Sequence, residues 1–393
     1  MPRKTPRPKL PADENMTTAA ICEYFAGVPD PRIERSQLHP LTTILVLSLC
    51  AVICGADSFV AIEQFGLARR AWLDPFIDFP NGIPSHDTLG RVFSALSPTA
   101  LAEAFRGWVA AVARITTGQV VAIDGKTLRR SYREAGSGAF VHMVSAWATQ
   151  NRIVLGQVKT EEKSNEITAI PKLLELLRIK GCLVTIDAMG CQKHIAEEIV
   201  HGGADYLLAV KDNQPTLNAE VIAVFQAARR DPSLLENMDY CETRDVGHGR
   251  IEVRRCWTTD DVQRVPSAGQ WRGLHNLALV EVERTVKGKT SIEQRHYICS
   301  RARLPATSAL DAARSHWGIE NQLHWVLDVA FREDDCRIRA GNAAENFAVM
   351  RHLALNMLKS VQGTKVGIQI RRLRAGWEND FFLRVLGARP EEV

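Results

Sequence analysis

Apolar and polar positions alternate at helical spacing over the first part of the chain, from about residue 21 to residue 117. Ser85 and Ser97 stand at the starts of two such segments, where serine side chains cap helices. The run LTTILVLSLCAVICGA, residues 41–56, is apolar but shorter than the roughly 18 to 20 residues of a membrane span. We therefore expect a buried helix within a helical N-terminal domain, and that domain could bind DNA or serve as a scaffold.

The pattern changes over residues 118–230, where short apolar runs of strand type alternate with helical segments. GQVVAIDG, GCLVTIDAMG and ADYLLAVKDNQ each read as one strand, and VHMVSAWATQNRIVLGQVKT reads as two strands around a turn. With the helical segments between them, the order is β-β-β-α-β-α-β-α. This order predicts an α/β fold with a mixed sheet and flanking helices on its faces.

Residues 231–302 return to strand patterns and predict a β-rich insertion, after which residues 303–362 read as two helices. Both ends of the chain are rich in basic residues. We expect residues 1–20 to be a flexible basic arm and residues 363–393 a basic tail, and either could contact DNA phosphates or simply be solvated. Six residues of the second helix form one apolar stripe: Phe347, Met350, Ala354, Met357, Leu358 and Val361.

Composition is that of an ordinary globular protein, since 46% of the 393 residues are hydrophobic and 24% are charged. These values exclude wholesale disorder and fibrous repeats. The formal net charge of +4 is compatible with a nucleic-acid partner without requiring one. The nine cysteines form no C-x-x-C pair, so we expect no structural zinc site and interpret them as reduced core residues of a cytosolic protein.

Two aspartates end predicted strands, Asp124 after VVAI and Asp187 after LVTI. Strand ends are where α/β proteins place their sites, although an aspartate before a small residue is also a common turn former. If the two strands are neighbours, the carboxylates repel each other unless they are protonated or bridged by a cation. Ligands that are all oxygen favour Mg²⁺ or Mn²⁺.

The helical segment 306–331 supplies a third acid, Glu320. His316, Glu320, His324 and Asp328 recur every four residues, so they lie roughly along one helix face. The spacing is not that of an H-E-x-x-H zinc site, and the two histidines are about 12 Å apart along the axis. The alternative to a functional site is a solvated polar face.

Basic residues accompany these acids. Lys126, Arg129 and Arg130 follow Asp124 closely, and Lys211 ends a third predicted strand. Cations around a carboxylate pocket suit a phosphodiester substrate, because metals take the scissile phosphate while the cations hold its neighbours. We expect these four side chains to surround the mouth of the pocket, the alternative being solvent exposure or pairing with a nearby acid.

Three blocks resemble DDE transposases of bacterial insertion sequences, in the branch that includes H-repeat-associated proteins: AIDGKTLRRS, LVTIDAMGCQKHIAEEIVHGGADYLLAVKDNQPTL and HWGIENQLHWVLDVAFREDDCRIRAGNAAENFAVMRHLALNML. DPRIERSQLHPLTTILVLSLCAVICGADSF and NGIPSHDTLGRVFSALSP resemble the N-terminal domain of that branch. The resemblance implies an RNase-H-like catalytic domain with the insertion before its last catalytic helix. It also implies that the strands of Asp124 and Asp187 are adjacent, and by motif Asp124, Asp187 and Glu320 match the catalytic, metal-binding triad.

The activity that this resemblance implies is metal-dependent cleavage of insertion-sequence ends and strand transfer into target DNA, with two Mg²⁺ (or Mn²⁺) ions. The implied partners are double-stranded DNA, as terminal inverted repeats and target, and a second copy in a homodimer on DNA. The implied location is the bacterial cytoplasm, at the nucleoid, with no membrane partner. The alternatives are an RNase-H-like nuclease without strand transfer and a domesticated DNA-binding protein without catalysis.

The chain departs from the Y-x-x-R-x-x-x-E-x-x-x-x-x-x-K signature of related transposases. Ala313, His316 and Leu327 stand at the Tyr, Arg and Lys positions. The phosphate contacts of those three residues are therefore not carried over. We expect Arg314 or His316 to substitute for them in binding DNA.

Overall fold

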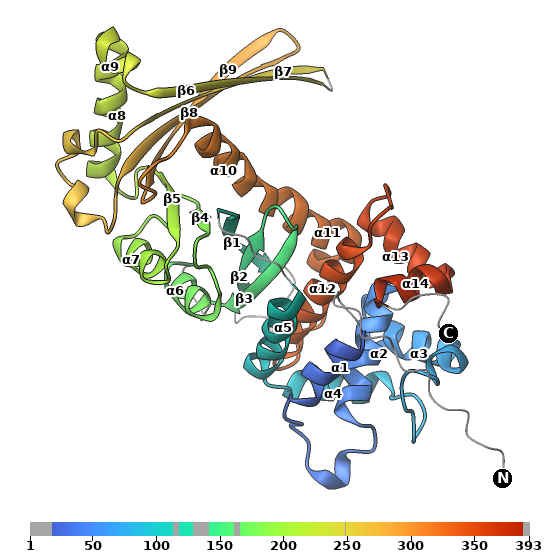
Figure 1. The fold of residues 1–393 in the computed structure, drawn as a ribbon. Coiled ribbons are helices and arrows are strands. Elements are labelled where there is room, and N and C mark those ends of the chain that lie inside the picture. The colour runs from blue at the N-terminus through green and yellow to red at the C-terminus, as the bar shows by residue number, and fades with distance from the viewer. Residues whose placement is uncertain (1–17, 113–117, 129–140, 161–165, 248, 388–393) are drawn as a thin grey trace.

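The first region of the chain is all-helical, as its periodicity predicts (Figure 1). Ser85 accepts a hydrogen bond from the Thr88 backbone N–H and so caps one helix, as predicted. The computed structural model describes residues 18–112, 118–128, 141–160, 166–247 and 249–387. The helices of the first region are α1 (Thr18–Ala26), α2 (Leu41–Ile53), α3 (Phe59–Leu73), α4 (His86–Ala95) and α5 (Pro98–Val112).

Helix α2 is the buried centre of this region, which confirms the prediction for residues 41–56. All of its residues except Thr42 are buried, and it packs against α3 and against α12 (Ala343–Ser360). Within the described chain, residues 34–53 form the one stretch long and apolar enough to cross a membrane, and 72% of its most apolar window is buried inside the protein. The apolar surface of α2 is therefore covered by neighbouring helices.

The centre of the molecule is a mixed nine-stranded sheet in the order β3-β2-β1-β4-β5-β9-β8-β7-β6. Its first five strands and their helices follow the predicted β-β-β-α-β-α-β-α order, which is the RNase-H-like arrangement expected from the resemblance. Strand β4 is parallel to both β1 and β5, whereas β2 and β3 form an antiparallel hairpin beside β1. The strands of this half are β1 (Val120–Leu128), β2 (Val141–Ala148), β3 (Ile153–Lys159), β4 (Leu183–Ile186) and β5 (Asp205–Val210).

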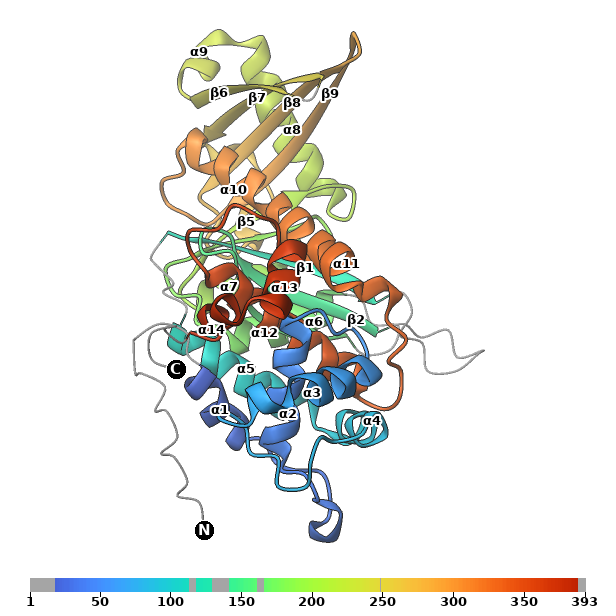
Figure 2. The same cartoon turned by 90° about the vertical axis from the view of Figure 1, so that its right-hand side faces the viewer.

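The predicted β-rich insertion is part of the same sheet. Its last strand, β9, pairs antiparallel with β5 through residues 207–210 and 296–299, so backbone hydrogen bonds run continuously from the core into the insertion. We call its four strands the ribbon, and they lie at the end of the molecule opposite the N-terminal helices (Figures 1 and 2). They are β6 (Asp239–Gly247), β7 (Arg250–Thr259), β8 (Asn276–Val286) and β9 (Lys289–Cys299).

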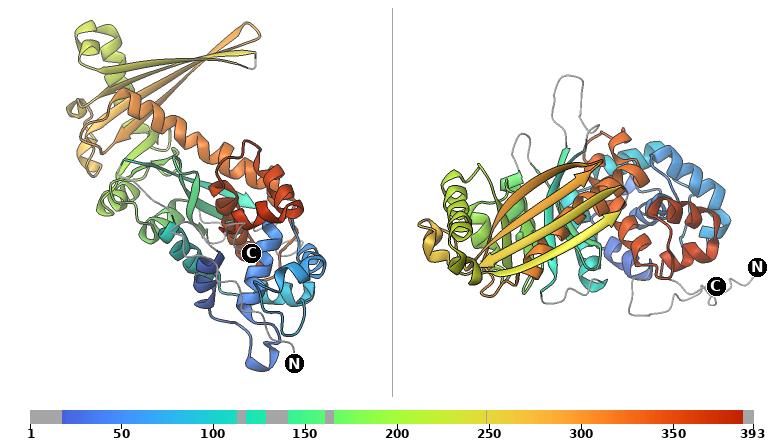
Figure 3. Two further views of the ribbon diagram at one scale, coloured as in Figure 1. Left: turned by 45° about the vertical axis from the view of Figure 1, so that its right-hand side comes forward. Right: turned by 90° about the horizontal axis from the view of Figure 1, so that it is seen from above.

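Helices cover the two faces of the sheet. One face is crossed by a single long helix, α10 (Ala306–Ile319), which contacts β1, β4 and β5 as well as the ribbon and runs towards α11 (Trp325–Phe331) (Figure 3). The other face is covered by the helices between the strands. These are α6 (Glu166–Leu176), α7 (Lys193–His201) and α8 (Pro215–Arg230), and the short α9 (Pro232–Glu236) follows them.

Helix α12 joins the sheet to the N-terminal helices. The six residues of its predicted apolar stripe lie in the core, as expected. The helix is buried on its other sides as well, so the buried surface is wider than the predicted stripe. Two of its buried polar residues, Asn346 and Asn356, find backbone partners. The Asn356 side chain donates to the Val154 carbonyl and accepts from the Val154 N–H, which satisfies the free edge of β3.

The basic C-terminal segment folds into two helices, α13 (Ile368–Trp377) and α14 (Asn379–Val385). The expectation that residues 363–393 form a solvated or phosphate-binding tail is wrong for its described part. Arg372 is only 3% exposed, and its guanidinium donates to the Val52 carbonyl and pairs with Asp57 at 2.9 Å. The positive charge of Arg372 is therefore paired inside the protein and does not face the solvent. The arm at residues 1–17 lies outside the described residues.

Candidate active site

Asp124 and Asp187 occupy equivalent positions on two neighbouring strands. Strands β1 and β4 are parallel and in register through Ile123 and Ile186, so each aspartate follows a paired isoleucine. The expected adjacency of the two strands is therefore confirmed. The structure corrects one detail, because β1 does not end at Asp124 but continues to Leu128 along β2.

A tight turn fixes the carboxylate of Asp187. Its Oδ1 accepts hydrogen bonds from the backbone N–H groups of Met189, at 3.0 Å, and Gly190, at 3.2 Å. Gly190 is required there because a Cβ would overlap the Ile186 side chain. Burial raises the pKa of Asp187 and the turn hydrogen bonds lower it, with a net rise to which Glu166 adds. The carboxylate is thus held in one orientation.

Glu166 is a fourth acid at this site that the sequence analysis did not identify. It is the first residue of α6, and its Oε1 lies 2.9 Å from His142 Nε2. Both side chains lie directly over Gly125, where any Cβ would overlap them. The Asp-Gly pair at residues 124–125 is the signal that could have indicated this close approach, because glycine permits it.

The helix that carries Glu320 contacts the sheet through three residues of the predicted polar face. His316 Nδ1 lies 3.2 Å from Thr185 Oγ1, His324 Nδ1 lies 3.4 Å from Asp124 Oδ2, and Asp328 accepts from Lys126. These contacts place three of the four predicted side chains along one face. Burial lowers the pKa of His316 to about 4 and that of His324 to about 3, so both imidazoles are neutral.

A π-helical turn, Glu320–His324, interrupts the helix between α10 and α11. In an uninterrupted α-helix of about 3.6 residues per turn, positions four apart drift round the axis by about 40° at each step. A π turn is closed by i→i+5 hydrogen bonds and takes up one extra residue, which cancels much of this drift. It therefore keeps His316, His324 and Asp328 facing the sheet. The sequence pattern gave no sign of this turn.

The acids act on one another electrostatically. Burial, followed by the negative charge of Glu166 and then of Asp187 and Glu320, raises the pKa of Asp124 to about 7. Glu320 itself is exposed. The negative charges of Glu166, Asp187 and Glu320 thus disfavour the ionised form of Asp124, and that of Glu166 also disfavours the ionised form of Asp187. Over the described ranges, no three His, Cys, Asp or Glu side chains are already arranged as a metal site.

Lys126 does not lie at the mouth of the pocket, where we expected it. Because β1 continues past Asp124, Lys126 falls on the same strand face and its ammonium turns inward, to Asp328 and to Glu333 Oε2 at 2.7 Å. Glu333 is also 3.5 Å from the buried Arg351. Lys126 is therefore part of an internal ion-pair network and is not available to DNA phosphates.

The other basic residues predicted to bind DNA lie in different surroundings. Lys211 follows β5, is exposed, and its charge lowers the pKa of Asp187, so it lies beside the acids. Arg314 is exposed and donates to Asp245 at 3.4 Å. His316 packs inward on Thr185 as a neutral ring, which does not suit a phosphate contact. Arg129 and Arg130 lie outside the described residues.

A groove of about 660 Å³ lies between the ribbon and α10. Strand alternation puts its lining residues on one face of the ribbon, whereas the opposite face carries Glu242, Glu281 and Glu283 around Arg255. The acids within the groove, Glu252 and Glu293, are paired with its arginines. The basic lining residues are Arg250, Arg254, Arg284, Arg295 and Arg314, with Trp317 and Asn321 at the end that leads to Glu320.

Comparison with known proteins gives a consistent result. Residues 22–109 match a family model described as DDE_Tnp_1-associated, and residues 115–357 match one described as Transposase DDE domain. The chain is 40% identical over 378 residues to the H repeat-associated putative transposase YhhI of Escherichia coli (strain K12), covering 94% of this chain and 98% of the relative. It is 41% identical over 382 residues to the putative transposase YncI of Escherichia coli O157:H7, covering 96% of each.

Among solved structures, a piggyBac transposase in its synaptic complex with hairpin DNA aligns with 95% of this chain and 79% of its own. The identity is 12% and the TM-score is 0.39, so this likeness is too distant to support an argument about the site.

Proposed function

Because the chain belongs to the DDE transposase family, we propose that it cuts DNA at the ends of a mobile element and joins the freed 3′-hydroxyl to target DNA. The observation that carries this proposal is the placement of Asp124 and Asp187 on adjacent parallel strands, with Glu320 acting on Asp124 from the crossing helix. Metal-assisted phosphoryl transfer requires carboxylates that can converge on the metal ions, and these three residues are the candidates for that role.

The donor set fits divalent metal ions. The acids offer only carboxylate oxygens, and burial together with the neighbouring negative charges raises the pKa of both Asp124 and Asp187, a penalty that a bound cation would offset. We assign Asp124, Asp187 and Glu320 as the ligands of two Mg²⁺ or Mn²⁺ ions, with Glu166 as a further carboxylate within electrostatic reach. Bound there, the metals would activate the attacking oxygen and stabilise the leaving oxygen.

The chain's own residues prepare this site in distinct ways. The turn at Met189 and Gly190 holds the Asp187 carboxylate in place before substrate arrives. The neutral His324 lies against Asp124 without adding charge, and the exposed Lys211 adds a cation on the side of Asp187. We assign Lys211 to a phosphate flanking the scissile one, and the same role for Arg129 and Arg130 stays a prediction.

The groove between the ribbon and α10 supplies a surface for duplex DNA. The groove is rich in arginine. Trp317, which lines one end of it, is on the same helix as Glu320 and about one turn before it. The opposite face of the ribbon carries three glutamates around Arg255, so the groove attracts phosphates more strongly than that face does. We propose that the DNA flanking the cleavage site lies along this groove, with Arg314 among its contacts. Assembly as a homodimer on DNA, in the bacterial cytoplasm, remains part of this proposal.

The proposal is tested by Asp187→Asn, which keeps the size of the side chain but removes an ionised metal ligand. We expect cleavage of duplexes carrying the gene's flanking DNA in Mg²⁺ to be abolished while DNA binding stays close to wild type, because phosphate contacts lie elsewhere. Asp311→Asn, an exposed acid on α10, is the matched control and should cleave normally.

Equal loss of binding and cleavage in Asp187→Asn would contradict the assigned role. A second readout separates transposition from simple hydrolysis, since a pre-cut end with a free 3′-hydroxyl should be joined covalently to plasmid DNA. Cleavage without any joined product would instead indicate a nuclease. Binding without either reaction in the wild-type protein would indicate a DNA-binding protein without catalysis.

A further inference from the structure

The π turn that carries Glu320 is held from outside the helix by one side chain. Lys359, on α12, donates a hydrogen bond of 2.7 Å to the Gln322 carbonyl in the middle of the turn. Widening a helix by one residue leaves part of its backbone without the regular i→i+4 partner. Lys359 supplies a partner at that point.

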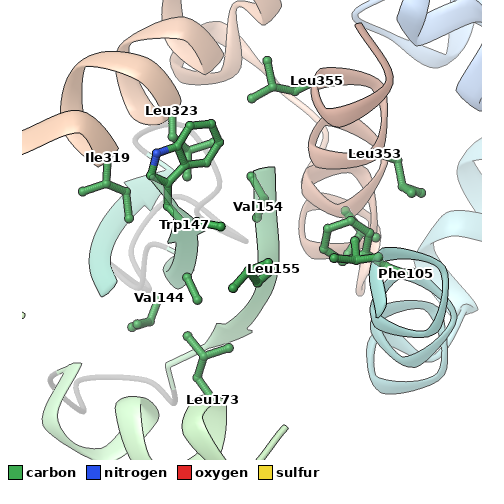
Figure 4. Close-up of a cluster of buried hydrophobic side chains, with 14 of the residues drawn as sticks. Phe105, Val144, Trp147, Val154, Leu155, Leu173, Ile319, Leu323, Leu353 and Leu355 are labelled. Carbon is green, nitrogen blue, oxygen red and sulfur yellow. The ribbon is translucent and has the colours of Figure 1, made fainter. Parts of the chain in front are cut away.

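An aromatic ring fixes the position of the same ammonium group. Lys359 Nζ lies 3.9 Å from the centre of the Trp147 ring, and Trp147 is fully buried on β2. In Figure 4 the Trp147 indole lies against Ile319 and Leu323, which stand on either side of Glu320 in the helix. One indole therefore supports both the helix that carries the acid and the lysine that holds its turn.

Burying the Lys359 ammonium in this way lowers the stability of the folded protein. The lysine is largely withdrawn from water, and the two charged side chains that act on it, Arg152 and Arg371, are also basic. Burial, reinforced by these two arginines, lowers the pKa of Lys359 to about 7. A methionine would fill the same volume without that penalty but would leave the Gln322 carbonyl without its donor, so what the lysine adds here is this one hydrogen bond to the turn.

We propose that Lys359 is a positioning residue that keeps the π turn in place and so fixes Glu320 relative to Asp124 and Asp187. The downstream half of the helix is anchored separately, by His324 against Asp124 and by Asp328 on Lys126. If the turn relaxed to a regular α-helix, Glu320 would rotate by about 100° relative to that anchored half. Glu320 would then no longer face the aspartates.

This inference rests on the proposed metal site, and the test separates the two. Lys359→Met removes the donor but keeps the side-chain volume, and Lys359→Arg keeps a charged donor. The exposed Lys365→Met is the matched control. The measurements are Mn²⁺ affinity by calorimetry without DNA, the single-turnover cleavage rate at saturating DNA and metal, the DNA dissociation constant, and the thermal midpoint.

We expect Lys359→Met to weaken Mn²⁺ binding and to slow cleavage by about 10- to 100-fold each, as for other residues that orient metal ligands. DNA affinity should be unchanged, the thermal midpoint should be no lower than wild type, and Lys359→Arg should recover most of the loss. A residue with only a structural role would lower the thermal midpoint and leave the Mn²⁺ affinity of the folded protein intact.

The inference is overturned if Lys359→Met binds Mn²⁺ and cleaves as wild type does. If Lys359→Met does not fold, Lys359→Gln takes its place with the same expected and contrary results. Failure of the proposed function looks different, because Mn²⁺ binding by the wild-type protein would then be unaffected by Asp187→Asn.

Discussion

Replacing Lys126 by Met should destabilise the protein by about 3 kcal/mol and leave its DNA binding unchanged. The Lys126 side chain is 11% exposed and Glu333 is 2% exposed, and the two are joined at 2.7 Å. Removing one partner of a buried ion pair costs about 3–5 kcal/mol, because the other charge stays buried without compensation. Glu333 keeps Arg351 at 3.5 Å, so we expect the lower end of that range.

The pKa of Glu333 gives a second measure of the same magnitude. Burial alone would raise this pKa, but Lys126 and then Arg351 lower it from its ordinary 4.5 to about 2. A carboxyl group with a lowered pKa in the folded state adds stability above its unfolded pKa, here about 3 kcal/mol above pH 4.5 at about 1.4 kcal/mol per pH unit. That stability is lost as the pH falls from about 4.5 towards 2, and most of this dependence should vanish in Lys126→Met.

The assay is chemical denaturation at several pH values, together with DNA binding over a range of salt concentrations. The double variant Lys126→Met/Glu333→Gln is the control, and it should be more stable than Lys126→Met alone because the fully buried carboxylate of Glu333 is no longer left without its lysine, whereas Asp328 is 31% exposed to water. The reasoning is refuted if Lys126→Met is as stable as wild type while the slope of log affinity against log salt becomes shallower by about one. That result would mean that Lys126 contacts a phosphate.

Two further predictions concern the DNA path and the acids. Arg250→Ala/Arg284→Ala should weaken binding to specific and random duplexes alike and make the salt slope shallower by about two, as measured by fluorescence anisotropy, because two phosphate contacts are lost. Arg244→Ala, on the opposite face of the ribbon, should leave the slope as it is, and an equal change in both variants would exclude the groove. Gly125→Ala should displace Glu166, lowering the thermal midpoint by the equivalent of about 1–3 kcal/mol and slowing cleavage, and a wild-type rate and midpoint would show that the close approach is unimportant.

Hydrophobic runs were sufficient to predict the order of strands and helices in the core, because each strand is apolar on both faces and bounded by turns. They could not predict how far β1 continues, since its last residues, DGKTL, are mostly polar and read as a loop. The inward direction of Lys126 depends on that continuation. Likewise the burial of Arg372 depends on backbone carbonyls far away in the sequence, which no local pattern reveals.

At the site, the two aspartates could be predicted from their positions after apolar runs, and their adjacency came from the family resemblance. Glu166 could not, because it begins a helix on the other face of the sheet and reaches Asp124 only across a glycine. The π turn escaped prediction for a related reason. Its extra residue changes the rotation of the helix without changing the spacing of polar residues, and the contacts that hold it come from α12 and β2.

The hydrogen bonds between β5 and β9 make the catalytic half and the ribbon one mechanical body. A smaller enzyme cannot be obtained by excising residues 231–302, because the cut would leave β5 as a bare edge ready to pair with another chain. It would also uncover the apolar side of α10 that now packs on β7 and β8. Truncation should therefore give aggregates instead of a minimal nuclease, and tension applied to the ribbon would reach β4, the strand before Asp187, through β5 alone.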